Sequence, residues 1–131
     1  MIRAYSFLKE CGIFYVITVN EGRPAGRPFG ALYEKDDRIY ITTGRSKDVY
    51  CQLKADPHVE IVGYNPMNGN WIRLDAVAAE CADKAVRKDM LEALPTLKKL
   101  YGSAGSTEYV VFELTEREAK INSAGKFVKV D

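Results

Sequence analysis

Short turns between apolar, β-branched runs constrain this chain more than any other feature. Residues 13–19 (IFYVITV) are β-branched or aromatic throughout, as buried strands commonly are. The turn NEGR follows them, and Asp36 and Asp37 form the next turn, between two further apolar runs. Strands joined this closely pair antiparallel, because a parallel crossover needs a dozen or more residues. The chain is therefore predicted to open with an antiparallel meander.

The rest of the chain continues the strand-rich pattern and inserts helices between the strands. Strands are predicted over residues 13–19, 27–35, 38–43, 59–64, 71–81 and 109–114, with residues 119–123 as a candidate seventh. Helices are predicted over residues 2–10, with Gly12 as the stop, and over residues 46–55. A third helix is predicted from a cap at Asp83 to about residue 93. A fourth is predicted from Pro95 to Gly102, with Leu97 and Leu100 on its buried side. This order predicts a mainly β, single-domain protein over residues 1–131: a small antiparallel barrel with peripheral helices.

Composition and charge exclude several classes of protein. The 131 residues are 47% hydrophobic and 28% charged, and their net charge of +1 gives no general attraction to nucleic acid or membrane. The N-terminus carries charges throughout, so we expect neither a signal peptide nor a transmembrane helix. Three cysteines, Cys11, Cys51 and Cys81, lie far apart without a CxxC pair, which favours a reducing cytoplasm.

A single histidine limits the chemistry that the side chains can perform. His58 has no Cys or His at metal-ligand spacing and no GxSxG motif to accompany it. We interpret it as an ordinary residue at the start of a strand, and no metal site is expected. No GxGxxG motif is present, so a Rossmann domain is not predicted either. An enzyme of this composition takes its chemistry from a cofactor.

The turn after the third predicted strand, residues 42–47, is rich in hydroxyl and cationic side chains. Its side chains are those of Thr42, Thr43, Arg45, Ser46 and Lys47. Ser46 is predicted to be the N-cap of the next helix, whose first N–H groups and positive dipole end suit a phosphate. In the alternative interpretation Ser46 only caps the helix and the cations are solvated. Asp48 counts slightly against a phosphate, although it also complements the helix dipole.

Two further stretches carry groups that recognise ligands. In RPAGRPFG, residues 23–30, Gly26 and Gly30 permit close backbone approach. Arg27 is predicted to reach the same anion as Lys47, because the second and third predicted strands pair. In NWIR, residues 70–73, an amide, a large π surface and a cation open the fifth predicted strand. Trp71 is either a core residue or the flank of a planar ligand.

In this order, the three stretches resemble the pyridoxamine 5'-phosphate oxidase-like, FMN-binding split-barrel superfamily. The resemblance runs from about residue 5 to residue 123, and its most specific parts are RPFGALYEKDDRIYITTGRSKDVYCQLKADPHVEI and NWIRLDAVAAECAD. It implies a six-stranded antiparallel Greek-key split barrel that forms a homodimer and binds FMN in a groove at the dimer interface.

The resemblance also implies roles for individual residues. Arg27, Ser46 and Lys47 would hold the FMN phosphate. Pro28, Phe29, Gly30, Thr42 and Thr43 would line the isoalloxazine ring and the ribityl chain. Asn70, beside Trp71, would approach the flavin from the partner subunit. Asp75 stands where the family often has glycine, and the spacing from Lys47 to Pro57 is longer than in the oxidases proper. The chain also lacks their extended C-terminal substrate-binding segment, so we expect a small, reductase-like member.

Three hypotheses for function follow from these residues. The first is an FMN-dependent oxidoreductase with NAD(P)H as a candidate electron donor and no assigned catalytic side chain. Tyr15, Tyr33 and Tyr64 are its candidate proton donors. The second is a non-catalytic flavin-binding or electron-shuttling module. Deazaflavin and haem are alternatives to FMN, and the axial ligand of a haem would have to be His58 or a non-histidine group. The third is a small-barrel nucleic-acid binder that uses Arg23, Arg27, Arg45 and Lys47, with surface tyrosines as stacking platforms.

Overall fold

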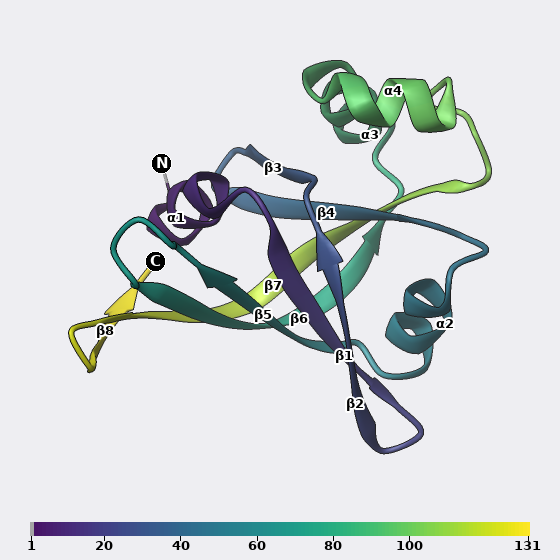
Figure 1. The fold of residues 1–131 in the computed structure, drawn as a ribbon. Coiled ribbons are helices and arrows are strands. Elements are labelled where there is room, and N and C mark those ends of the chain that lie inside the picture. Colours follow the sequence, from purple (N-terminus) through teal and green to yellow (C-terminus); the bar gives the residue numbers. More distant parts are fainter. Residues whose placement is uncertain (1) are drawn as a thin grey trace.

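Eight strands form one antiparallel sheet in the computed structural model, which describes residues 2–131. The order is β2–β1–β5–β6–β7–β4–β3, and β8 pairs with β7 off this path. The bounds are β1 (Phe14–Asn20), β2 (Arg23–Phe29), β3 (Leu32–Lys35), β4 (Arg38–Gly44), β5 (His58–Tyr64), β6 (Trp71–Cys81), β7 (Tyr109–Ser123) and β8 (Lys126–Val130). Figure 1 shows the strongly twisted strands crossing one another around a central core. The prediction of a mainly β, antiparallel split barrel is confirmed, although the sheet has eight strands and not six.

The predicted second strand, residues 27–35, is wrong because the structure divides it. β2 ends at Phe29 and pairs with β1, whereas β3 begins at Leu32 and pairs with β4. The break at Gly30 and Ala31 lets the chain pass from one part of the sheet to the other. Arg27 therefore lies opposite Val16 of β1. The predicted pairing with residues 38–43 is correct for residues 32–35, which pair with residues 38–41, and wrong for the half that contains Arg27.

At the C-terminal side, the two strands predicted over residues 109–114 and 119–123 are one strand. β7 is 15 residues long and continues through an irregularity, where its register with β6 shifts between Asp75 and Val77. Glu116, close to this shift, has φ 50°. A tight turn at Ala124 and Gly125, both with positive φ, then leads into β8, which the sequence pattern did not predict.

Three of the four helices begin and end close to the predicted positions. They are α1 (Arg3–Cys11), α3 (Lys84–Ala93) and α4 (Pro95–Tyr101). Gly12 ends α1 with φ 79°, and the Asp83 carboxylate caps α3 by accepting hydrogen bonds from the N–H groups of Ala85 and Val86. None of the helices within residues 2–131 is long and apolar enough to span a membrane.

The start of α2 (Asp48–Ala55) differs from the prediction. Its N-cap is Lys47, which makes no capping hydrogen bond through its side chain, so the prediction of Ser46 as N-cap is wrong. The Ser46 hydroxyl instead donates a hydrogen bond to Glu108, 62 residues further along the chain. A tertiary contact has therefore replaced the local cap that the sequence suggested.

Two apolar clusters hold the fold together. The first fills the barrel beneath α1 and α2; its fully buried members include Phe7, Leu8, Phe14, Leu32, Ile41, Leu53, Ile61, Ile72, Leu74 and Phe112. The second packs α3 and α4 against the outside of β4 and β7, through Tyr40, Val86, Met90, Leu91, Leu97, Tyr109 and Val111. Figure 1 shows α3 and α4 together at one end of the molecule, away from α1 and α2. Leu97 is buried as predicted, but Leu100 is 69% exposed, so its predicted burial is wrong.

Candidate functional site

A groove of about 310 Å³ lies where the β2–β3 connection meets the end of β4, the start of α2 and one side of α4. Its lining residues are Arg27, Pro28, Phe29, Gly30, Ala31, Thr42, Thr43, Lys47, Val49 and Leu97. Seven of the ten residues that the sequence assigned to a cofactor site are in this set. The fold has brought them together from segments that are far apart in the chain.

Arg27 is held in this groove by neutral acceptors alone. Its Nη2 donates to Gln52 Oε1 at 2.7 Å, and its Nη1 has three acceptors at 2.8–3.2 Å. These three are the Val16 carbonyl, the Thr18 hydroxyl and the Ala25 carbonyl. Partial burial lowers the pKa of Arg27, a change that Asp48 opposes, but a guanidinium remains protonated at any ordinary pH. No carboxylate of residues 2–131 forms an ion pair with it, so Arg27 brings an oriented positive charge to the groove that only the more distant Asp48 partly offsets.

Lys47 and Thr43 add two more groups that can contact an anion. Lys47 is exposed and forms no ion pair within the described residues. Thr43 is only 7% exposed, yet its hydroxyl has no hydrogen-bond partner in the part of the chain that the structure describes. The neighbouring Thr42 differs, since its hydroxyl donates to the Val110 carbonyl at 2.7 Å. Two cations without an ion pair and one hydroxyl without a hydrogen bond are suited to the oxygens of a phosphate.

Ser46, the third residue assigned to a phosphate, does not line the groove. Its backbone N–H and its hydroxyl donate to the Glu108 carboxylate, at 3.1 Å and 2.5 Å respectively. A Cβ atom on Gly44 would lie 2.5 Å from Glu108 Oε2, so glycine at this position lets the carboxylate approach. The donors of Ser46 are therefore engaged by an acidic side chain of the same protein.

The remaining wall of the groove is apolar. It is formed by Phe29, Ala31, Val49 and Leu97. Gly30 lies beside this wall, and a Cβ atom added there would make an ordinary 3.6 Å contact with Ile13. The packing of the fold therefore does not require glycine at position 30. Apolar walls with a few placed polar groups are typical of cofactor sites, and the absent side chain leaves space for a planar group.

Asn70 and Trp71 lie outside the groove, at the start of β6. Trp71 is half-buried and belongs to neither apolar cluster, so its interpretation as a core residue is wrong. Its ring packs edge-on against Phe127 of β8, with ring centroids 5.2 Å apart, and the Arg73 guanidinium lies 5.2 Å from its centroid. The N–H of Asn70 donates to the side chain of Asn68 within the β5–β6 turn.

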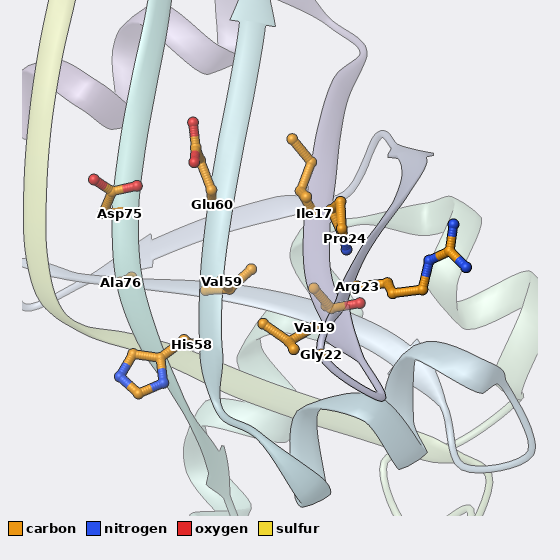
Figure 2. Close-up of a pocket in the computed structure, with 11 residues that line it drawn as sticks. Ile17, Val19, Gly22, Arg23, Pro24, His58, Val59, Glu60, Asp75 and Ala76 are labelled. Carbon is orange, nitrogen blue, oxygen red and sulfur yellow. The ribbon is translucent and has the colours of Figure 1, made fainter.

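A second hollow, of about 420 Å³, lies on the sheet across β2, β1, β5 and β6. Figure 2 shows Glu60 and Asp75 on adjacent strands there, beside the apolar Ile17 and Pro24. His58 begins β5, as predicted, and its Nδ1 lies 2.8 Å from an oxygen of Asp56. This hollow has no lining residue in common with the groove.

Sequence reasoning missed the residues that complete the groove and its supports. These are Ala31, Val49 and Leu97 in the lining, Gln52 behind Arg27, and Glu108 beside Ser46. The one local signal was the amphipathic pattern that placed Leu97 on a buried side. The contacts of Gln52 and Glu108 depend on pairings 25 and 62 residues apart, which no local motif records.

Comparison of the sequence with models of protein families identifies the family of this chain. A family model described as pyridoxamine 5'-phosphate oxidase matches residues 3–122. The chain belongs to the pyridoxamine 5'-phosphate oxidase family. The resemblance inferred from the sequence is therefore confirmed, and the family match covers all the residues that line the groove.

Solved structures agree with membership of this family. A NimC/NimA family protein from Clostridium acetobutylicum is 38% identical, with a TM-score of 0.91 over 98% of this chain and 89% of that chain. General Stress Protein 26 from Bacillus anthracis str. Sterne shares the fold at 13% identity, with a TM-score of 0.77 over 95% of each chain. A pyridoxamine 5'-phosphate oxidase-related, FMN-binding protein from Nostoc punctiforme does so at 14% identity, with a TM-score of 0.69 over 97% of this chain and 90% of that chain. No curated protein matches the chain.

Proposed function

We propose that the protein is an FMN-dependent oxidoreductase that binds its flavin in the groove. The observation that carries the proposal is the donor set: Arg27 and Lys47 lie on one groove without a carboxylate partner among residues 2–131. A guanidinium and an ammonium that share one groove and have no ion-pair partner can both form charge-assisted hydrogen bonds with a phosphate dianion. A neighbour in the same fold is described as FMN-binding, which supports the choice of anion.

The residues of the groove fit each part of FMN. Arg27 and Lys47 would hold the phosphate, and the unpaired Thr43 hydroxyl would donate a hydrogen bond to it or to the ribityl chain. Phe29, Val49 and Leu97 would exclude water from the ring system, with Gly30 leaving room at its edge. Bound FMN would supply the transfer of hydride or electrons.

None of the three tyrosines considered as proton donors lines the groove. Tyr15 and Tyr64 are more than half exposed, at 51% and 56%, and Tyr33 packs against Tyr40. The role of this chain's side chains is therefore binding and orientation. His58 also lies outside the groove, so it is not placed to ligate a haem there. The cations of the nucleic-acid hypothesis do not share one pocket: Arg23 lies in the second hollow, and Arg45 faces Tyr50 and Glu80.

The test is spectroscopic. Protein soaked with FMN and freed of excess should show the two absorption bands of an oxidised flavin. NADH or NADPH should then bleach these bands, and electron transfer to an acceptor should be faster than with free FMN. Retention of flavin without faster transfer would leave a flavin-binding module and refute the oxidoreductase. Failure to retain flavin would refute both.

The proposed homodimer would use the outer face of β5, β6 and β7. The cross-strand register of this face aligns one acidic row, Glu60, Asp75 and Glu118. The adjacent row, two residues away along the same strands, contains Arg73 and Lys120. Within the chain, one ion pair already joins the two rows, since Arg73 Nε lies 3.0 Å from Glu60 Oε1. Like charges directly opposite each other destabilise a sheet, and a two-fold axis between the rows would place the remaining charges, those of Asp75, Glu118 and Lys120, against opposite charges of the partner. This supports an isologous interface.

The outer face of β5, β6 and β7 continues to the groove on one side and includes Trp71. A dimer formed through this face would therefore suit a flavin site shared between subunits. Pro28 lines the groove and lies opposite Tyr15 of β1, which in turn lies opposite Val62 of β5. At its other end the face contains Trp71, beside Asn70, which the family resemblance places against the partner's flavin.

Charge reversal tests the interface by sedimentation velocity across a concentration series. Lys120→Glu should shift the protein towards monomer, because it extends the acidic surface across the proposed axis. Adding Glu118→Lys should restore the dimer by exchanging the two charges between the rows. Dimerisation that is unaffected by Lys120→Glu, or not restored by the second change, would contradict this face as the interface.

A further inference from the structure

A second cationic pocket, of about 560 Å³, lies between the start of α3, the end of β6 and the loop that precedes β7. It has no lining residue in common with the groove. The turn at residues 42–47 contributes a cation to each site: Lys47 lines the groove, whereas Arg45 lines this pocket. Figure 1 shows the connection from α4 to β7 passing near the end of β6, below the two helices.

Arg87 of α3 is the most firmly held cation of this pocket. Its Nη2 donates to the carbonyls of Ala104 and Ser106, at 2.8 Å and 3.3 Å. The guanidinium carbon lies 4.6 Å from the ring centroid of Tyr109, which is fully buried. The Tyr109 hydroxyl also donates to the Arg87 carbonyl at 2.9 Å, so Arg87 is fixed through both its main chain and its side chain. No carboxylate among the described residues pairs with it.

Two lysines add to this charge without compensation. Lys84 and Lys88 both line the pocket and are one helical turn apart on α3, and neither forms an ion pair within residues 2–131. Glu80 is the one acidic residue of the lining. It is already engaged by Lys54 at 3.0 Å and by Arg45 at 3.4 Å. Three cations of one pocket therefore lack a negative partner.

We propose that this pocket binds a small phosphorylated anion, held by Lys84, Arg87 and Lys88. A phosphate dianion compensates several clustered cations at once, and an oriented guanidinium matches its oxygens better than a mobile ammonium does. Ala82 and Ala104 provide apolar surface beside the charges, and the volume of the pocket leaves space for an organic group next to the phosphate. The proposal is independent of flavin binding, because the two sites have no residue in common.

Titration of the ¹⁵N-labelled full chain with inorganic pyrophosphate, at constant ionic strength, tests the proposal. Saturable shifts are expected for the amide signals of residues 84–88 and 104–107. The double variant Lys84→Ala/Lys88→Ala should weaken this binding at least tenfold, because it removes two charged hydrogen-bond donors. Lys98→Ala/Lys99→Ala is the matched control, since these are exposed lysines of α4 and the change in net charge is the same.

The outcomes separate this pocket from the groove and from general electrostatic attraction. Loss of the shifts in the α3 double variant, with the control unchanged and Lys47→Ala without effect on them, supports the pocket. Absence of saturable shifts at residues 84–88 and 104–107 overturns it. Equal weakening in both double variants, or none in the α3 variant, also overturns it. Unchanged melting temperatures confirm that both double variants are folded.

Discussion

Replacing Lys47 with alanine tests the phosphate end of the groove directly. The side chain is exposed at the N-cap of α2, without an ion pair within the described residues and without a capping hydrogen bond. Its loss should therefore leave the melting temperature unchanged. A hydrogen bond to a charged group contributes about 1.5–3 kcal/mol, so FMN affinity should fall roughly ten- to a hundredfold.

Riboflavin separates a phosphate contact from a structural role. It has the same ring and ribityl chain as FMN but no phosphate, so Lys47→Ala should leave its affinity almost unchanged. Quenching of flavin fluorescence, titrated with each ligand in turn, gives both dissociation constants. Lys126→Ala, an exposed lysine of β8, serves as the control for net charge. Equal losses for FMN and riboflavin would show that Lys47 supports the groove without contacting phosphate, and the proposed orientation of the flavin would be wrong.

Two further substitutions examine the groove, and a third examines Glu80, which lines the second cationic pocket. Glu108→Gln should raise FMN affinity several-fold, because it removes a negative charge beside Gly44 and Lys47. Riboflavin affinity should not change in the same titration. An unchanged FMN affinity would count against a phosphate beside Lys47. Gly30→Ala should weaken both flavins while the melting temperature stays within a few degrees of the wild type; a large loss of stability would contradict the 3.6 Å contact described above. Burial alone would raise the pKa of Glu80, but the positive charges of Lys54 and Arg45 outweigh burial and lower this pKa below 4.5. The stability that Glu80 contributes is therefore present above pH 4.5 and is lost as the pH falls. Urea unfolding of Glu80→Gln should show a deficit of up to about 1 kcal/mol at pH 7 that shrinks progressively as the pH falls below 4.5. A deficit that does not change with pH would indicate lost packing.

The sequence predicted those parts of the fold that short-range chemistry determines. The β-branched run of β1, the carboxylate cap of Asp83 and the proline that begins α4 each have a local cause, and each was predicted close to its observed position. Strand ends were less predictable. The break at Gly30 and Ala31 could not be predicted, because nothing local shows that the two halves of the apparent strand have different partners.

In the candidate site, too, contacts between distant residues could not be predicted from the local sequence. Arg27, Thr43 and Lys47 were recognised by residue type and order, and the structure does place them on one groove. Which donors are unpaired could not be predicted, because that depends on distant partners. Ser46 is engaged by Glu108, whereas Lys47, the next residue, has no ion-pair partner within residues 2–131.

The place of β7 in the sheet has a consequence for synthesis of the protein. β7 is next to last in the chain but lies between β6 and β4 in the sheet. Until residues 109–123 have left the ribosome, β4 and β6 each lack a neighbour, and their unpaired N–H and C=O groups can pair with other chains. The barrel therefore closes late, and a nascent chain stalled before residue 109 should be prone to aggregation even though most of its strands are already made.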